Sequence, residues 1–184
     1  MGLIMVDLDG TLFDTREVNY RAYREAIKPF GYEMDYEYYC TYCNGRHYLD
    51  FLPRITTSDN KILEKIHKRK KELYRSFLKF ARLNDSLLSM LRSLKENYKI
   101  VLVTTASKSN TNDILGAFGI NDFFDLILTH EDIVKSKPDP EGFLKAMDYF
   151  QAAPEDCVIF EDSEVGIEAA MKTGAAVYVV KGYN

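Results

Sequence analysis

Two pairs of acidic side chains follow short apolar runs in this 184-residue sequence. The first pair lies in Asp7-Leu8-Asp9-Gly10-Thr11, and the second is Glu161-Asp162. Paired carboxylates can divide into a nucleophile or metal ligand and a group that gives and takes a proton. Two acidic clusters at one sheet edge would also supply the oxygen ligands that Mg²⁺ prefers. The simpler alternatives are an acidic strand-to-loop turn for the first pair and a helix N-cap for Asp162.

Hydroxyl and ammonium groups that could join this chemistry occur at two further places. Thr104 and Thr105 end another apolar run, and their hydroxyls can donate to phosphate oxygens. The segment from Lys135 to Pro140 supplies Lys137, which can balance an anionic transition state. Threonine is common at strand ends, and a solvated surface lysine is the simpler interpretation of Lys135.

The segments that must position these groups alternate between apolar runs and amphipathic stretches. Strands are predicted over Leu3–Val6, Ile100–Val103, Phe124–Leu128, Cys157–Phe160 and Ala175–Val180. Helices are predicted over Asn84–Asn97, Asn110–Phe118 and Ser163–Thr173, with another opened by Asp139 as N-cap and Pro140 in the first helical position. Continuously apolar strands are typical of burial on both faces. The sequence therefore predicts an α/β fold with a doubly wound, five-stranded parallel sheet, whose strand ends bring the polar groups to one edge.

A helical insert is predicted to interrupt this core after its first strand. Helical patterns cover Tyr20–Phe30, Tyr36–Tyr42 and Ile62–Phe80, the last with Ile62, Ile66, Leu73 and Phe77 on one stripe. We therefore expect a small all-helical unit over residues 16–82 and a core made of residues 1–15 and 83–184.

Composition excludes several classes of protein. The formal net charge of −4 gives no reason to expect nucleic acid, and the run Lys61 to Arg82, with nine basic and two acidic residues, is most simply a solvated helix face. The longest apolar run is too short for a membrane span, and residues 1–6 lack the cationic flank of a signal peptide. Three cysteines cannot form a disulfide framework without leaving one over. We expect a cytoplasmic protein, and nothing in the sequence indicates its oligomeric state.

The order of the four motifs along the chain identifies a family far more specifically than any one motif does. The motifs are Asp-x-Asp-Gly-Thr, the strand-end threonine, Lys-Pro and Glu-Asp. With this order the chain resembles the haloacid dehalogenase-like hydrolase superfamily. Lys137–Phe143 and Ile159–Ala170 are especially similar to its phosphoglycolate phosphatase and beta-phosphoglucomutase branch. The resemblance implies a Rossmann-like core and identifies the insert as a helical cap of the type placed after the first motif.

The resemblance also implies roles for the motif residues. Asp7 would be the nucleophile that forms an aspartyl-phosphate, and Asp9 would protonate the leaving oxygen and then deprotonate water. Thr104, with Thr105 as a less certain partner, would hold the phosphoryl oxygens, and Lys137 would neutralise Asp7 and the phosphate. Gly10 would allow a tight turn away from the site.

A magnesium site is implied in the same way. Its ligands would be the Asp7 carboxylate, the Asp9 backbone carbonyl and Asp162, with Glu161 binding directly or through water. The activity implied is a Mg²⁺-dependent phosphatase acting on a small phosphorylated metabolite, with no nucleic-acid or membrane partner.

Two alternatives to a phosphatase remain at this point. A sugar phosphomutase shares the core chemistry, but its branch usually has a histidine where this chain has Asn19, and an amide cannot shuttle a proton. A non-catalytic phospho-acceptor or interaction protein would lack the cap or a motif residue. Asp9 argues against a true dehalogenase, because a halide leaves without needing a proton.

The cap carries three ambiguous signals. Nine of the thirteen tyrosines fall between residues 16 and 82, where they either line a substrate surface or pack the cap. The segment Asn44 to His47 is expected to interrupt the second cap helix, with Gly45 and Arg46 as candidate specificity contacts. Cys40, Cys43 and His47 resemble a zinc half-site, but His67 is the only loose candidate for a fourth ligand, so packing is the simpler interpretation.

Overall fold

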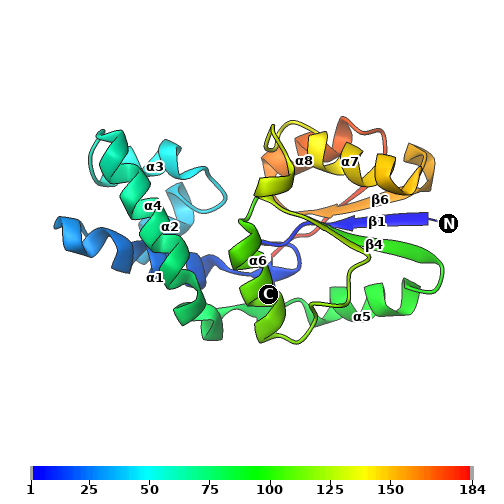
Figure 1. The fold of residues 1–184 in the computed structure, drawn as a ribbon, viewed down its shortest axis with the longest axis horizontal. Helices are drawn as coiled ribbons and strands as arrows, with labels where there is room; N and C mark the ends of the chain where they lie inside the picture. The colour runs from blue at the N-terminus through cyan, green and yellow to red at the C-terminus, as the bar shows by residue number, and fades with distance from the viewer. Residues whose placement is uncertain (1, 183–184) are drawn as a thin grey trace. The chain divides into compact units, whose positions relative to one another are not determined.

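The computed structural model describes residues 2–182 and divides into two compact units. One unit combines residues 1–14 with residues 82–184, and the other comprises residues 15–81 (Figure 1). Among the described residues, no helix combines the length and the apolar character that crossing a membrane requires.

The first unit is built on a five-stranded, all-parallel sheet with the strand order β5-β4-β1-β6-β7 (Figure 1). The strands are β1 (Gly2–Val6), β4 (Tyr98–Val103), β5 (Leu126–Leu128), β6 (Cys157–Glu161) and β7 (Ala176–Val179). The central position of β1 follows from crossovers that run outward on both sides, as in a doubly wound fold. This confirms the predicted fold class.

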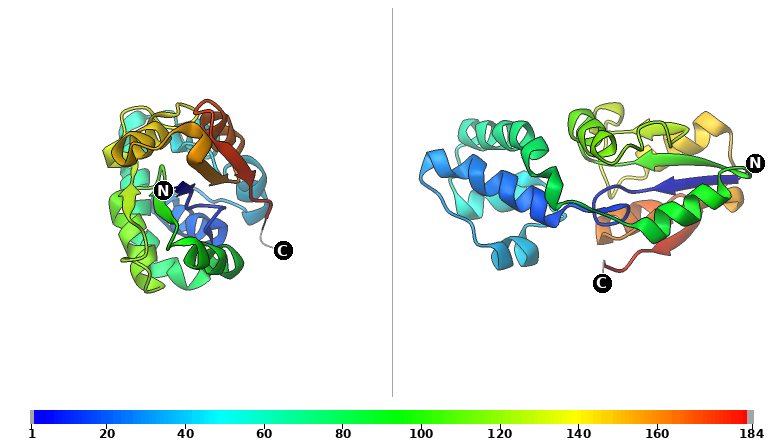
Figure 2. Two further views of the ribbon diagram at one scale, coloured as in Figure 1. Left: turned by 90° about the vertical axis from the view of Figure 1, so that its right-hand side faces the viewer. Right: turned by 90° about the horizontal axis from the view of Figure 1, so that it is seen from below.

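Helices cover both faces of the sheet, which explains why its central strands are continuously apolar. Those of this unit are α5 (Asp85–Leu94), α6 (Lys108–Ala117), α7 (Glu141–Phe150) and α8 (Glu164–Met171), with short 3₁₀ turns η3 (His130–Asp132) and η4 (Pro154–Asp156). Helices α7 and α8 lie on one face and α5 on the other (Figures 1 and 2). Met5, Val101 and Ile159, which are neighbours across three strands, are fully buried with Phe143 of α7 and Ala170 of α8.

The structure corrects one predicted helix start and decides against the alternative of Asp162 as a helix cap. Helix α7 begins at Glu141 with Pro140 as its N-cap residue, so the prediction of Asp139 as cap was wrong by one position. The Asp139 carboxylate still accepts a hydrogen bond from the backbone N–H of Glu141, at 3.1 Å. At the start of α8 the cap is Ser163, whose Oγ accepts from the Gly166 N–H at 3.1 Å, so the Asp162 side chain is not needed as a cap.

A short antiparallel pair that the sequence did not predict closes the core unit where the insert begins and ends. Strand β2 (Phe13–Asp14) pairs with β3 (Arg82–Leu83). Asn84 ties the two segments together, since its side-chain amide donates to the Thr11 carbonyl at 3.2 Å. Strands of two residues are too short to show the alternating hydrophobic pattern from which strands are predicted.

The second unit is all-helical. It contains α1 (Arg16–Ile27), η1 (Lys28–Phe30), α2 (Tyr36–Tyr42), α3 (Tyr48–Ile55), α4 (Asn60–Tyr74) and η2 (Arg75–Phe80). Helix α3 was not predicted, and the segment Asn44 to His47 connects two helices rather than interrupting one.

The buried face of α4 also differs from the predicted stripe. Leu63, Ile66, Lys70 and Tyr74 are the buried positions. The predicted stripe ran on to Phe77, which lies beyond the end of α4 in the 3₁₀ segment η2, where the helical period changes. The Lys70 ammonium lies 5.0 Å from the centre of the Tyr74 ring and 5.1 Å from that of Tyr23. Hydrophobic periodicity does not predict the burial of a lysine, even where its ammonium packs against aromatic rings as here.

Candidate active site

The acidic residues of the first motif follow directly from β1. The backbone N–H of Asp7 donates to the Phe160 carbonyl at 3.0 Å, which ties the end of β1 to β6. The chain then turns back, and the Gly10 N–H donates to the Phe13 carbonyl at 2.7 Å. Asp7 is buried, whereas Asp9 is partly exposed. The two carboxylates of this motif therefore have different environments, as a division of roles requires.

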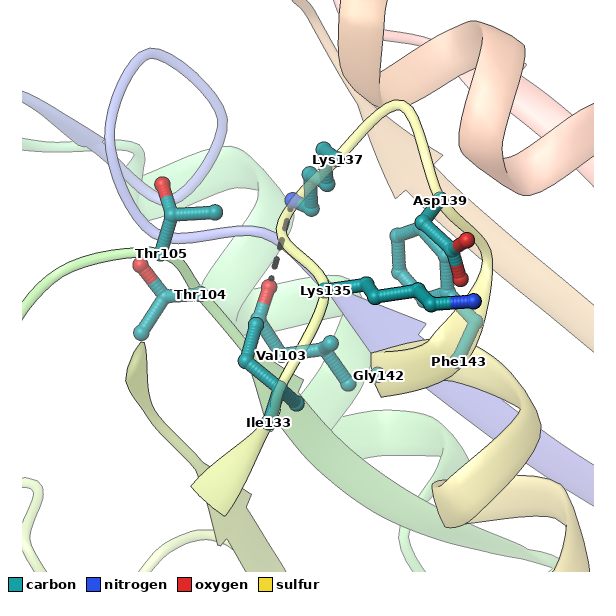
Figure 3. A pocket seen from close by; sticks show the side chains of 9 residues that line it. All are labelled: Val103, Thr104, Thr105, Ile133, Lys135, Lys137, Asp139, Gly142 and Phe143. Carbon is teal, nitrogen blue, oxygen red and sulfur yellow. Dashed lines mark hydrogen bonds between the residues drawn. The ribbon is translucent and has the colours of Figure 1, made fainter. Parts of the chain in front are cut away.

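The ammonium of Lys137 lies among the ends of three neighbouring strands. Its Nζ is 2.6 Å from Asp7 Oδ1 after β1 and 2.5 Å from Glu161 Oε1 at the end of β6. It also donates to the carbonyl of Val103, the last residue of β4, at 3.4 Å (Figure 3). The sheet order, with β1 between β4 and β6, is what makes this three-way contact possible.

Glu161 is held by the backbone that follows it. While one carboxylate oxygen contacts Lys137, the other accepts from the N–H groups of Asp162 and Ser163, at 2.8 and 2.9 Å. The Ser163 hydroxyl is a third donor, at 3.1 Å. Gly166 leaves room for this carboxylate, because a Cβ at that position would overlap it. Both oxygens of Glu161 are therefore engaged within the chain.

Asp162 completes the acidic group. Its Oδ1 accepts from the Thr11 hydroxyl at 2.9 Å. The carboxylate also lies against Gly10, which has φ = +94°, so that any Cβ there would collide with it. Thr11 was not singled out from the sequence. The signal was its place in the Asp-x-Asp-Gly-Thr motif.

The carboxylates of Asp7, Glu161 and Asp162 can each offer an oxygen within 4.8 Å of the others. Among residues 2–182 this is the group of side chains that could hold a metal ion. A set made only of oxygens fits a hard cation such as Mg²⁺. The structure thus brings together the four predicted site residues Asp7, Lys137, Glu161 and Asp162.

The charges of this group are unbalanced, with three carboxylates around one ammonium. Burial raises the pKa of Asp7 well above its usual range, and the Glu161 carboxylate adds to the rise while Lys137 opposes it. Burial, reinforced by Glu161, also raises the pKa of Asp162 to about 6, against the Thr11 hydrogen bond. Burial alone would lower the pKa of Lys137, but the carboxylates of Asp7 and Glu161 outweigh it and raise that pKa. An added divalent cation would relieve the excess of negative charge.

The two candidate threonines differ in exposure. Thr104 is buried and its Oγ1 accepts from the Ala106 N–H at 3.0 Å, which leaves its own proton free to be donated elsewhere; Thr105 is exposed. Both line a small hollow that is open to solvent, together with Lys137 (Figure 3). Its other lining residues are Val103, Ile133, Lys135, Asp139, Gly142 and Phe143. The threonines, Lys137 and the end of β4 therefore share one surface.

The remaining candidates belong to the helical unit. Gly45, with φ = +75°, and Arg46 are exposed in the connection between α2 and α3. The Arg46 N–H donates to the Cys43 carbonyl at 3.1 Å, which closes the turn. Cys40 and Cys43 are free thiols, and burial raises the pKa of Cys43 to about 11. That shift disfavours the thiolate form that binds metals.

Comparison with known proteins places these features in a family. The chain is 28% identical over 180 residues to a phosphorylated carbohydrates phosphatase of Thermotoga maritima, covering 95% of this chain and 82% of that protein. It is 28% identical over 193 residues to the pyrophosphatase PpaX of Bacillus cereus, covering 97% and 84%.

A solved structure is similar over the full chain. CbbY from Rhodobacter sphaeroides, in complex with phosphate, superimposes with a TM-score of 0.85 at 25% identity, covering 100% of this chain and 88% of that one. A mutant of CbbY has been solved in complex with xylulose-(1,5)bisphosphate. A family model matches residues 4–180, and the chain therefore belongs to the haloacid dehalogenase-like hydrolases.

Proposed function

We propose that this protein is a Mg²⁺-dependent phosphatase that hydrolyses a small phosphorylated metabolite through an aspartyl-phosphate on Asp7. The observation that carries the proposal is the Lys137 ammonium between Asp7 and Glu161, at 2.6 and 2.5 Å. An ammonium in this position holds a nucleophilic carboxylate in place and balances the negative charge of an incoming phosphoryl group. The names of PpaX and of the Thermotoga phosphatase support the same class of reaction. The complex of the CbbY mutant with xylulose-(1,5)bisphosphate supports a small phosphorylated ligand.

The reaction has two steps. A carboxylate oxygen of Asp7 attacks phosphorus, the bond to the leaving oxygen breaks, and Asp9 gives that oxygen its proton. Asp9 then takes a proton from water, whose oxygen attacks the same phosphorus and releases inorganic phosphate from Asp7. General acid–base help of this kind contributes about 10²- to 10⁴-fold in rate.

Other residues hold the phosphoryl group while this happens. The hydroxyl of Thr104, assisted by Thr105, donates to a phosphoryl oxygen, and Lys137 offsets the charge that builds up on the others. These three residues line the hollow at the end of β4.

The acidic group would hold Mg²⁺ through the carboxylates of Asp7 and Asp162 and the backbone carbonyl of Asp9. Glu161 would contribute directly or through water, in keeping with its existing hydrogen bonds. When bound, the ion supplies positive charge that lets an anionic carboxylate approach an anionic phosphate.

Substrate choice is assigned to the helical unit. The cap corresponds to the helical unit of residues 15–81, one residue earlier at each end than the expected 16–82, with Gly45 and Arg46 as the specificity contacts. A cap excludes water and supplies contacts to the leaving group. This arrangement suits a small metabolite and calls for no nucleic-acid or membrane partner.

Phosphate release from a panel of phosphorylated metabolites and p-nitrophenyl phosphate tests the proposal. Hydrolysis should require Mg²⁺, stop in EDTA, and fall by at least about 10³-fold in Asp7→Asn, which lacks the nucleophile. Asp148→Asn, an exposed aspartate of α7, is the matched control and should keep wild-type activity. No release from any compound would refute the phosphatase assignment.

The mutase alternative is separated in the same assay. Asn19, which stands where the mutase branch usually has a histidine, donates its side-chain amide to Thr15 Oγ1 at 3.1 Å within the first turn of α1. We therefore expect hexose 1-phosphate with glucose 1,6-bisphosphate to give free phosphate, not hexose 6-phosphate. Accumulation of hexose 6-phosphate would favour the mutase.

The specificity role of the cap has its own test. Arg46→Ala should change the ratio of activities among metabolites more than it changes turnover of p-nitrophenyl phosphate. Arg24→Ala, another exposed arginine of the same unit, is the control. An equal loss on all substrates would contradict a specificity role for Arg46.

A further inference from the structure

Lys137 lies on a segment without helix or strand. Residues 133–140 connect η3 to α7, and half of them are exposed, although the side chain of Lys137 itself is largely buried. The three contacts of its Nζ, to Asp7, Glu161 and the Val103 carbonyl, must be reproduced closely for the ammonium to act. An error of about 1 Å in a positioned group can cost about 10²-fold in rate. The backbone before Lys137 therefore needs its own means of support.

That support comes from Glu141, the first residue of α7. Its Oε1 accepts from the Val134 N–H at 2.9 Å, and its Oε2 accepts from the Lys135 N–H at 2.8 Å. The carboxylate thus binds two successive backbone amides, the second of them two residues before Lys137. We call these two hydrogen bonds the Glu141 clamp.

A lysine one turn further along α7 completes the arrangement. Lys145 Nζ lies 2.8 Å from Glu141 Oε1 and also donates to the Asp132 carbonyl at 2.8 Å. The hydrogen bond from Lys145, with those from the Val134 and Lys135 amides, lowers the pKa of Glu141 to about 2. The clamp therefore stays ionised throughout the neutral range.

The other side of Lys137 is held independently. Lys172, the residue directly after α8, donates to the Pro138 carbonyl at 2.8 Å, and Asp139 accepts from the Glu141 backbone N–H. Loss of the Glu141 carboxylate should therefore loosen the segment before Lys137 without releasing the segment after it.

We infer that Glu141 is a positioning residue, which holds the loop so that the Lys137 ammonium stays between Asp7 and Glu161. Neither the motif roles implied by family resemblance nor the charge pattern of the sequence assigns a task to this side chain. The inference rests on the proposed function, because it assumes that Lys137 acts in phosphoryl transfer. Glu141 itself touches no reacting atom.

The test compares Glu141→Gln with a matched control. The glutamine keeps the size of the side chain but offers one acceptor oxygen for two amides and loses the pair with Lys145. Asp85→Asn removes a carboxylate from the first position of α5, a helix of ten residues like α7, so it controls for the charge at a helix N-terminus. Lys145→Gln removes the ion pair and the hydrogen bond to the Asp132 carbonyl but keeps both amide contacts.

We expect kcat of Glu141→Gln to fall by about 10- to 100-fold with KM changed by less than about 3-fold. Hydrogen exchange of the Val134 and Lys135 amides should accelerate, while Asp85→Asn matches the wild type in both measurements. Lys145→Gln should show the same pattern with a smaller loss. A kcat of Glu141→Gln within twofold of wild type, or unchanged exchange at the two amides, overturns the inference.

Two further outcomes are covered by the design. If Glu141→Gln does not fold, Glu141→Asp decides, because it keeps the charge on a side chain one carbon shorter that cannot hold both amides at these distances. A lower kcat with faster exchange at the two amides supports the clamp, and wild-type values in both overturn it. If the wild-type protein releases no phosphate, the proposed function fails, and the exchange measurement still decides whether Glu141 orders the loop.

Discussion

Replacing Gly10 by alanine should damage the metal site and the stability of the core together. Gly10 has φ = +94°, a conformation that residues with a Cβ rarely adopt, and an added Cβ would overlap the Asp162 carboxylate. The Asp162 side chain would have to move, and its hydrogen bond from Thr11 Oγ1 at 2.9 Å would break.

The size of the effect follows from these two contributions. An alanine in the left-handed region costs about 1–2 kcal/mol. The reduced freedom of the unfolded chain returns about 0.4–1 kcal/mol, which leaves a net loss of about 1 kcal/mol from backbone strain. A hydrogen bond to a charged acceptor contributes about 1.5–3 kcal/mol. Gly10→Ala should therefore lower the free energy of unfolding by about 2–4 kcal/mol.

Gly31 supplies the control for strain alone. Its φ of +82° is similar, and nothing lies within 4 Å of a Cβ built there. Gly31→Ala should lower the free energy of unfolding by about 1 kcal/mol. Urea unfolding in EDTA measures both variants without any contribution from metal binding.

The metal requirement provides a second, independent measurement. If Asp162 ligates Mg²⁺ as proposed, its displacement should raise the Mg²⁺ concentration for half-maximal activity of Gly10→Ala by at least about 10-fold, and that of Gly31→Ala should not change. If the two variants lose the same stability and Gly10→Ala keeps the wild-type Mg²⁺ requirement, the assigned contact between Gly10 and Asp162 has no functional weight.

Two further predictions concern the same unit. Because the folded-state pKa of Asp162 is raised to about 6, its proton stabilises the metal-free protein at low pH, and this contribution is lost as the pH rises through about 6. Mg²⁺ must displace that proton, so half-maximal activity should need about tenfold more Mg²⁺ at pH 5 than at pH 7, and an equal requirement would count against Asp162 as a ligand. Asn84 accepts from the Leu87 N–H at 3.1 Å and donates to the Thr11 carbonyl, so Asn84→Ala should lower the free energy of unfolding by about 1–2 kcal/mol in urea. Asn97→Ala, at an exposed position, should change the free energy of unfolding little. A similar loss in both variants would argue against Asn84 as the N-cap residue of α5.

The core fold could be predicted because its strands are buried on both faces. Ile4, Ile100 and Ile159 are each within 2% of complete burial, and such strands read as continuous apolar runs whatever their order along the chain. The topology then follows from general rules for parallel sheets, which also bring the ends of β1, β4 and β6 together. The proximity of Asp7 and Glu161 was accessible from sequence for this reason, whereas Lys137 lies on a loop and its role was implied by the family resemblance.

Other features could not be predicted, since they depend on side chains reaching across loops. The Glu141 clamp joins a helix start to amides six and seven residues earlier, and no periodic pattern records such a contact. The buried face of α4 includes Lys70, a charged residue that a stripe of apolar residues leaves out. The roles assigned to Asp9, Thr104 and Arg46 stay predictions, and the comparison of Arg46→Ala with Arg24→Ala addresses the last of them.

The β2–β3 pair has a consequence for how such a protein can change over time. Asp14 faces Arg82 in register, so the chain leaves the core and returns to it at adjacent positions. The segment between these two residues is therefore an insertion at one place on the core surface, and insertions are tolerated best at such surface positions. A segment of different length or sequence could occupy this place without altering the register of β1 against β4 and β6. At this position one helical unit can be replaced by another, while the acidic residues at the ends of β1 and β6 keep their places.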